Sequence, residues 1–226
     1  MKLESYFASI GSQEEQTQLD IIANNIANSN SPGYKKDTLS FNALLGQVES
    51  TDMSQGPIRQ TGNNLDIALS GSGLLSVQTS NGTTLYTRAG DLAVNSSNQL
   101  VTQDGWPVLG KGGTPVTVTN VAALRISKTG QIIDGTNPPN QLALVTFPPN
   151  SLKKVQGGYF QPVNSSTQPQ QATGCTVEQQ ALEGANLNPV QEMAKLIEAT
   201  RYFETYQKTL KSSNTLDSEL IAKTSG

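Results

Sequence analysis

The chain has 226 residues, which is long enough to bury a core in one or two domains. Hydrophobic residues make up 35% of it and aromatic residues 5%, while Gly (20) and Pro (11) are frequent, a composition more typical of an elongated, loop-rich protein than of a compact enzyme. Its 15 basic and 18 acidic residues give a formal net charge of -3 without a long run of either sign. We therefore expect no binding to nucleic acid.

Missing residue types narrow the possible chemistry. The chain has no histidine, the commonest general base and metal ligand, and its single cysteine, Cys175, cannot form an internal disulfide or a cysteine cluster for zinc. We expect no catalytic residues, no metal and no cofactor. The N-terminus lacks the basic start, apolar run and cleavage site of a signal peptide, and no stretch is apolar enough for membrane insertion.

The first predicted element is a helix over about residues 3 to 29. Apolar residues recur there at helical spacing: Leu3, Phe7, Ile10, Leu19, Ile22 and Ile26. Polar gaps at Glu14 and Thr17 make this apolar seam thin, and the sequence Ser31-Pro32-Gly33 ends the helix. A helix of this length with so thin a seam needs a partner to be stable.

The next residues lose the helical periodicity, and we interpret residues 31–60 as an extended connector. From about residue 61 to residue 181, short runs rich in Leu, Val, Ile and Thr alternate with turn residues, which predicts a β domain of many short strands. The expected strands are 66–69, 74–78, 83–88, 91–94, 99–102, 115–119, 124–127, 131–134 and 142–147. Hairpin turns are expected at Ser80-Asn81-Gly82 and Lys128-Thr129-Gly130, because Asn and Gly accept positive φ.

The last predicted element is a second long helix, within a C-terminal segment of residues 182–226. Asn188 and Pro189 form a typical helix start, as an Asn cap and a Pro at the first helical position. A stripe at spacings of three and four follows: Leu196, Ala199, Phe203, Tyr206 and Leu210. The predicted fold class is α+β: residues 1–30 and 182–226 contribute two long helices that pair as a coiled-coil-like stem, and residues 61–181 form a central all-β domain.

The residues at the end of the first helix also resemble a known family. The run Asn24-Asn25-Ile26-Ala27-Asn28, followed by Ser31, Gly33, Tyr34 and Lys35, is similar to the N-terminal signature of the bacterial flagellar rod and hook proteins. Leu182-Glu183-Gly184-Ala185-Asn186-Leu187-Asn188-Pro189-Val190 resembles the C-terminal signature of the same family.

Part of the predicted β domain carries the same resemblance. The similar segments are Gln60-Thr61-Gly62-Asn63, Leu65-Asp66-Ile67-Ala68, Gly71-Ser72-Gly73, Tyr86-Thr87-Arg88-Ala89-Gly90 and Gln99-Leu100-Val101. Leu74-Leu75 stands where the family usually has paired Phe, so this core is less aromatic. Residues 111–180 carry no resemblance.

The resemblance implies a structural protein, a subunit that stacks helically into the periplasm-spanning rod of the flagellar basal body and contributes to motility. It implies that the chain binds copies of itself and other axial proteins, and that the flagellar type III apparatus exports it without a cleaved signal peptide. The expected assembly-interface residues are Ile22, Asn24, Asn25, Ile26, Asn28, Leu196, Phe203, Tyr206 and Leu210.

A short element in the connector is the candidate for export. Phe41-Asn42-Ala43-Leu44-Leu45 resembles the Phe-x-x-x-apolar element by which rod and hook subunits engage the export gate, with Phe41 and Leu45 as its ends. A simple apolar anchor against the body of the protein is an equal alternative.

The sequence also allows several alternatives to a rod subunit. Chain length and the short connector favour the proximal-rod group, with a distal-rod or hook-type axial protein as the alternative. A secreted β-rich binding module trimerised by its helices would need sustained heptads, which Glu14 and Thr17 interrupt.

The aspartates Asp66, Asp91, Asp104 and Asp134 could form a carboxylate pair for glycoside hydrolysis, but Asp beside Gly, Asn or Ser at strand ends usually caps turns. The near-match Gly71-Ser72-Gly73 to a dinucleotide fingerprint precedes a strand pattern where a helix should start.

Overall fold

The computed structural model describes residues 2–42, 46–135 and 140–224, and side chains within 6–39, 50–135, 140–213 and at 215. Two helices, α1 (Lys2–Ala27) and α2 (Pro189–Thr224), enclose in sequence a series of short strands. The first eight strands are β1 (Asp37–Asn42), β2 (Gly46–Thr51), β3 (Ile58–Gln60), β4 (Ile67–Ser70), β5 (Leu74–Gln78), β6 (Thr84–Thr87), β7 (Ala93–Val94) and β8 (Leu100–Val101). The others are β9 (Arg125–Ile126), β10 (Ile132–Ile133), β11 (Leu144–Thr146), β12 (Leu152–Lys154), β13 (Tyr159–Pro162), β14 (Gln170–Gln171), β15 (Thr176–Gln179) and β16 (Ala181–Glu183).

The chain divides into two compact units. The helical unit comprises Met1–Asn28, Asp37–Glu49 and Asn188–Gly226, and the β unit comprises Ser29–Lys36 and Ser50–Leu187. The α+β class is therefore as predicted. The division differs from the expected domains in that the connector is shared: residues 29–36 belong to the β unit, while residues 37–49, with β1, belong to the helical unit.

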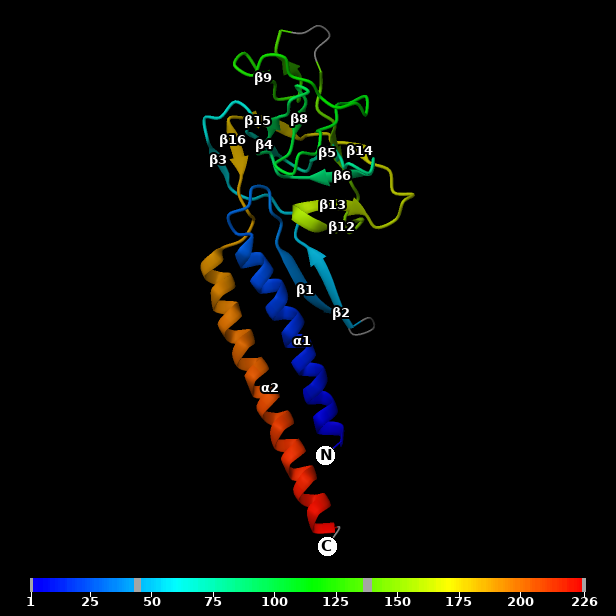
Figure 1. Cartoon of the computed structure of the whole chain (residues 1–226), viewed down its shortest axis with the longest axis vertical. Coiled ribbons are helices and arrows are strands. Elements are labelled where there is room, and N and C mark those ends of the chain that lie inside the picture. The colour runs from blue at the N-terminus through cyan, green and yellow to red at the C-terminus, as the bar shows by residue number, and fades with distance from the viewer. Residues whose placement is uncertain (1, 43–45, 136–139, 225–226) are drawn as a thin grey trace. The chain divides into compact units, whose positions relative to one another are not determined.

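The helical unit consists of α1 and α2 side by side in opposite directions (Figure 1). Both predicted ends of the helices are present in the structure. The side-chain amide of Asn28 donates to the backbone oxygen of Asn24 at 2.9 Å, at the last turn of α1. The backbone N–H of Val190 donates to the side chain of Asn188 at 3.0 Å, which is the predicted N-cap of α2. Interlocking of the two helices as a coiled coil stays a prediction.

A six-stranded sheet with the order β12-β13-β6-β5-β11-β14 lies at the centre of the β unit. The two predicted turns are confirmed, since β5 pairs with β6 around Gly82 and β9 with β10 around Gly130, and both glycines have positive φ. The sheet buries apolar residues on both faces. Leu75 belongs to the larger core cluster, whereas its neighbour Leu74 packs with Tyr86 and Phe160 in a second cluster.

The early and late strands of the β unit pair with each other. β15 pairs with β4 and β16 pairs with β3, both antiparallel. The core they help to close is aliphatic, and its most buried members are Ile67, Leu69, Leu75, Val77, Leu100, Val108, Val116, Val118 and Ile132.

Strand predictions were incomplete, and the segment expected to be an extended connector itself contains β1, β2 and β3. The expected strand at 115–119 is replaced by isolated bridges of Pro115 with Leu109 and of Thr117 with Gln99, because neighbouring residues there make backbone bonds to different segments. Strands β12 to β16 were not predicted individually, since each has two to four residues and most are partly polar.

Candidate functional site

The face of α2 that is turned to α1 follows a strict spacing of four and three residues. Its buried or half-buried residues are Glu192, Leu196, Ala199, Phe203, Tyr206, Leu210 and Ser213. Four of the predicted assembly residues, Leu196, Phe203, Tyr206 and Leu210, thus lie on one stripe within the helix pair. The ring of Tyr206 packs over Gly11 of α1, where an added Cβ would come within 2.7 Å of ring carbons.

The matching face of α1 has the same spacing but is more polar. Its residues are Ala8, Ser12, Glu15, Leu19, Ile22 and Ile26. The seam therefore continues past Glu14 and Thr17, where the sequence suggested an interruption, by using the polar Ser12 and Glu15. Gln207 of α2 donates to Ser12 at 2.8 Å, whereas one carboxylate oxygen of Glu15 is buried without a partner. Burial, followed by the nearby charges of Glu14 and Glu198, raises the pKa of Glu15.

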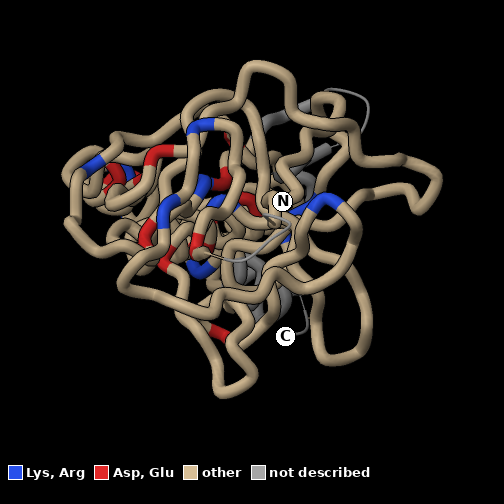
Figure 2. Tube along the Cα trace, turned by 90° about the horizontal axis from the view of Figure 1, so that it is seen from above, with Lys and Arg blue, Asp and Glu red and all other residues tan. Residues whose placement is uncertain are grey.

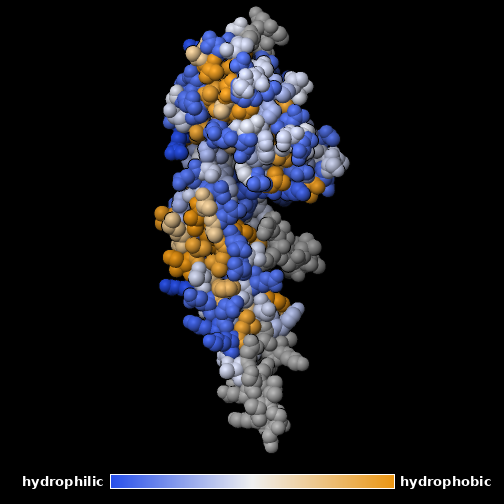
Figure 3. Space-filling model, in the orientation of Figure 1, coloured by the Kyte–Doolittle hydropathy of each residue, from blue (hydrophilic) through white to orange (hydrophobic). Residues whose placement is uncertain are grey.

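A second stripe lies on the opposite side of α2. Val190, Met193 and Ile197 are 74%, 51% and 58% exposed, and they recur at helical spacing on the face turned away from α1. Figure 3 shows the resulting hydrophobic patch over the first half of α2. We call these three residues the outer stripe. The outer stripe was not predicted as a site, although its residues have 3,4 spacing directly after the capped start of the helix.

The three predicted asparagines at the end of α1 have different environments. Asn25 is buried, and its amide pairs with both backbone groups of Asp37: it donates to the carbonyl oxygen at 2.8 Å and accepts from the N–H at 3.0 Å. Asn25 thereby ties the start of β1 to α1, so its role within the fold is internal. Asn24 is exposed, and Asn28 is half-buried and bonded to Asn24.

The candidate export element can be placed only in part. Phe41 belongs to β1, but its side chain lies outside the described ones, and Leu45 lies outside the described residues. Both assignments stay predictions.

The β unit contains a buried charge cluster that the sequence analysis did not predict. Glu183 accepts from Lys35 at 2.7 Å and from Arg88 at 2.5 Å, and the three side chains are 0%, 1% and 4% exposed. We call these residues the buried triad. Burial lowers the pKa of Lys35, and its hydrogen bond with Glu183 opposes that shift. A single carboxylate faces two cations here. The N–H groups of Lys35 and Arg88 that do not bond Glu183 therefore need other acceptors.

Backbone groups meet that need. The guanidinium of Arg88 donates to the carbonyl oxygens of Gly73 at 2.5 Å and Leu69 at 2.6 Å, and Lys35 donates to that of Ser54 at 2.6 Å. The N–H of Gly56 donates to Glu183 at 2.8 Å. Gly56 is required at this point, because a Cβ there would lie 2.1 Å from the oxygen of Gly184. The triad thus joins segments that are far apart in the chain.

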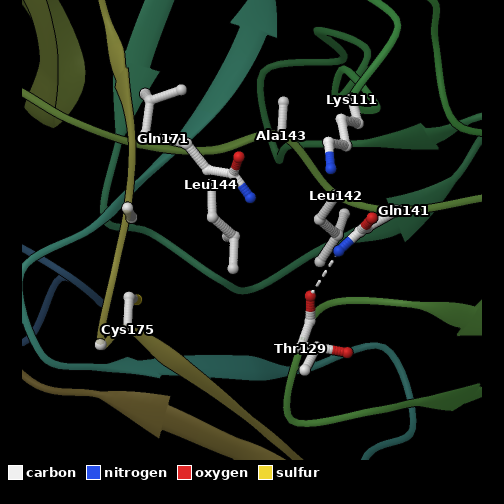
Figure 4. A pocket seen from close by; sticks show the side chains of 11 residues that line it. Lys111, Thr129, Gln141, Leu142, Ala143, Leu144, Gln171 and Cys175 are labelled. Carbon is white, nitrogen blue, oxygen red and sulfur yellow. Dashed lines mark hydrogen bonds between the residues drawn. The ribbon is translucent and has the colours of Figure 1, made fainter.

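One hollow of about 460 Å³ lies beside β11 and β14 (Figure 4). Leu142, Leu144 and Cys175 give it apolar walls, and Lys111 and Gln141 lie at its polar side. Burial raises the pKa of the Cys175 thiol, which keeps it in its unreactive protonated form. Among the lining residues there is no paired acid and base, so the hollow does not have the features of a catalytic site.

Three of the aspartates considered as a carboxylate pair accept hydrogen bonds from other residues of the β unit, and only those of Asp66 are local. Asp66 accepts from Thr61 and Asn63, Asp134 accepts from the backbone N–H of Thr119, and Asp104 accepts from Tyr159. These bonds support the structural interpretation of the aspartates. In the described part of the chain, no group of three or more His, Cys, Asp or Glu residues could hold a metal ion.

Basic and acidic residues occur next to one another along the chain (Figure 2). No helix within the described ranges is long and apolar enough to cross a membrane.

Three segments of the chain match models of one protein family. Residues 6–35 match "Flagella basal body rod protein", residues 68–133 match "Flagellar hook protein FlgE/F/G D1 domain", and residues 178–222 match "Flagellar basal body rod FlgEFG protein C-terminal". Each matched segment supplies one member of the buried triad, namely Lys35, Arg88 and Glu183.

Curated relatives agree with these matches along most of the chain. The flagellar basal-body rod protein FlgF of Caulobacter vibrioides is 31% identical, over 91% of this chain and 91% of its own length. FlgG of Agrobacterium fabrum is 30% identical over 93% and 95%, and FlgF of Salmonella typhimurium is 28% identical over 92% of both chains. Proteins of this family are structural and not known as enzymes. The chain belongs to the family of flagellar basal-body rod proteins.

Proposed function

We propose that this chain is a proximal-rod subunit, which polymerises helically with copies of itself and with other axial proteins through its helical unit. Membership of the rod family gives the structural role in the flagellum, and export and motility follow from the family. The FlgF-like similarity supports the proximal position, with a distal-rod position as the alternative, because FlgG relatives match nearly as well.

The observation that carries the proposal is the double-sided character of α2. One side of the helix packs on α1, while the outer stripe leaves three large apolar side chains exposed on the other side. A contiguous exposed apolar patch on a helix is typical of a protein interaction site. We infer that the outer stripe binds another copy of the same chain. Every subunit along a rod presents the same stripe, and a head-to-tail contact can repeat along the polymer without closing into a ring.

The helix pair is also poorly suited to stand alone. Ser12, Glu15 and Ser213 occupy seam positions, and buried oxygen atoms of Glu15 and Ser213 have no partner. Each such group costs about 1–3 kcal/mol when it is buried unbonded. We therefore propose that the helices gain full order in the assembled rod, and that helicity rises on assembly.

Export through the flagellar type III gate belongs to the same proposal. Phe41 and Leu45 are the candidate export element, and localisation is the periplasm-spanning rod of the basal body.

Three aspartate variants of α2 test the proposal. Ile197→Asp places a charge on the outer stripe and is expected to abolish rod assembly and motility while the helix pair still forms. Phe203→Asp places the charge in the seam, where desolvation without a partner costs several kcal/mol, and is expected to disrupt both pairing and assembly. Thr205→Asp is the matched control, because Thr205 is exposed and its hydroxyl bonds only within the helix.

Three measurements are needed: motility of the cells, electron microscopy of isolated rods, and thermal unfolding of the β unit in purified protein. Normal rods in the Ile197→Asp strain would exclude the outer stripe as a contact between subunits. Normal rods in the Phe203→Asp strain would exclude the proposed helical interface altogether.

A further inference from the structure

The β unit is completed by the last residues before α2. Residues 176–187, which we call the closing segment, contain β15 and β16. β15 pairs with β4 along four residues and β16 pairs with β3 along three. Among the described strands, β3 and β4 have no other partner within their two-stranded sheets. The earliest strands of the β unit therefore depend on the latest ones for their hydrogen bonds.

This dependence lies inside the core. Ile67, Ala68 and Leu69 of β4 are at most 1% exposed, and Val177 and Ala181 of the closing segment are 2% and 0% exposed. Without the closing segment, β4 would lose its ladder partner and much of its apolar cover. Buried backbone groups without partners are rare in native proteins because each is costly.

A single side chain of the closing segment connects two further regions. The amide of Gln179 donates to the carbonyl oxygens of Asn64 at 2.8 Å and Leu124 at 3.1 Å, and it accepts from the N–H of Ile126 at 2.9 Å. The loop before β4 and the strand β9 are thus held through one glutamine. Contacts over such sequence separations form late in folding, because closing long loops costs entropy before any contact forms.

The core of the β unit depends most strongly on the closing segment through the buried triad. Lys35 and Arg88 are buried cations, and Glu183 of the closing segment is the carboxylate that pairs with both. Before residue 183 arrives, a native-like core would hold two uncompensated positive charges. Breaking a buried pair in this way is strongly destabilising, and small domains have little stability to spare.

We propose that the closing segment controls folding of the β unit: no stable β core forms until residues 176–187 have paired with β3 and β4 and placed Glu183 between Lys35 and Arg88. The β unit then folds in one step, with its early and late strands in a single cooperative unit. The consequence for export rests on the proposed function. A chain that passes its N-terminal part through the export gate first would stay unfolded until its C-terminal end has followed.

Native-state hydrogen exchange of the full, unmodified chain tests the single cooperative unit without any variant. The expected result is that the slowest amides of β4, β5, β6, β15 and β16 exchange at rates within tenfold of one another, because all require the same global opening. The proposal is overturned if the amides of β15 and β16 exchange more than tenfold faster than those of β5 and β6, since the core would then persist without the closing segment.

Two carboxylate variants sharpen the test. Glu183→Gln removes the charge that pairs with both cations and is expected to accelerate exchange in all five strands together, by about 100-fold or more. Glu178→Gln is the matched control on β15, because its side chain is half-buried and outside the triad; a change below threefold is expected.

Acceleration confined to β15 and β16 in Glu183→Gln would overturn the proposal. A Glu183→Gln chain with no protected β amides would support it, and the wild-type rates decide independently. This measurement involves neither rods nor motility, so it can fail while the proposed function stands, and the reverse also holds.

Discussion

Replacing the whole buried triad with apolar residues tests how much of its stabilising effect comes from charge. The variant is Lys35→Met, Arg88→Met and Glu183→Leu in one chain. Buried ion pairs can often be exchanged for well-packed apolar residues of similar volume without loss, because their desolvation cost cancels most of the attraction. On charge alone, the triple variant would be about as stable as the wild type.

The structure predicts a different result, because the triad also bonds the backbone. The N–H of Gly56 donates to Glu183, and the carbonyl oxygens of Leu69 and Gly73 accept from Arg88. Apolar side chains cannot replace these three bonds. The oxygen of Ser54 is excluded from this count because it keeps a bond from Asn186. At about 1 kcal/mol or more for each orphaned group, the triple variant should lose at least roughly 3 kcal/mol.

Urea unfolding of the full chain measures this loss. Trp106, the single tryptophan, packs against the core with its ring 4.5 Å from that of Tyr159, and its fluorescence reports on the β unit. Lys153→Met is the control, because Lys153 is exposed on β12, and its effect should stay within about 0.5 kcal/mol. Single Glu183→Leu, which leaves Lys35 and Arg88 buried without their carboxylate, should cost about 3–5 kcal/mol. A triple variant as stable as the wild type would refute the reasoning, because the three backbone groups would then have found other partners.

Two further predictions concern single residues. Burial, and then the charges of Asp66 and Asp104, raises the pKa of Asp91 in the folded state above its unfolded value of about 3.8. Ionisation of Asp91 therefore destabilises the folded state, and this loss develops as the pH rises from the unfolded pKa through the higher folded one. Asp91→Asn should therefore raise the melting temperature at pH 7 and leave it unchanged near pH 3; a gain at both pH values would point to a cause other than ionisation. Phe41→Ala should reduce export of the chain, measured in a strain stalled at rod assembly, if an aromatic anchor fills a pocket of the gate. Normal export would return Phe41 to a simple anchoring role.

Local sequence patterns predicted the elements whose stability is local. Both helices were found from their 3,4 periodicity, and Asn188 as the N-cap of α2 follows from side-chain chemistry within one turn. The β5–β6 hairpin was found because Gly82 supplies the positive φ that its turn requires. In each case the signal and the contact lie within a few residues of each other.

The same patterns failed where a polar residue occupies a buried position. Glu14 and Thr17 were taken as gaps in the seam of α1, but the polar residues Ser12 and Glu15 continue it. The face of a helix is set by the spacing of its residues, and a seam position can hold a polar side chain. The pairing of Asn25 with the backbone of Asp37 was not predicted, and the part of Asn25 in assembly stays a prediction. Nothing within the helix sequence indicates that partner twelve residues away.

Long-range pairing explains the remaining omissions. β15 and β16 are short and partly polar, and what makes them strands is the presence of β4 and β3, more than 100 residues earlier in the chain. The outer stripe was missed for a different reason. One apolar face per helix was expected, and α2 has two.

The buried triad shows why short signatures at opposite ends of a chain can depend on one physical constraint. Lys35, Arg88 and Glu183 are unremarkable in their local sequences, and each would be expected on the surface. None of them can be buried alone, because an isolated buried charge costs more than its segment gains by packing. Burial of either cation therefore requires Glu183, and in the β unit the three matched segments meet at this carboxylate. Under the proposed role of the closing segment, this pairing is a condition for folding of the β unit, and it precedes any contact between subunits.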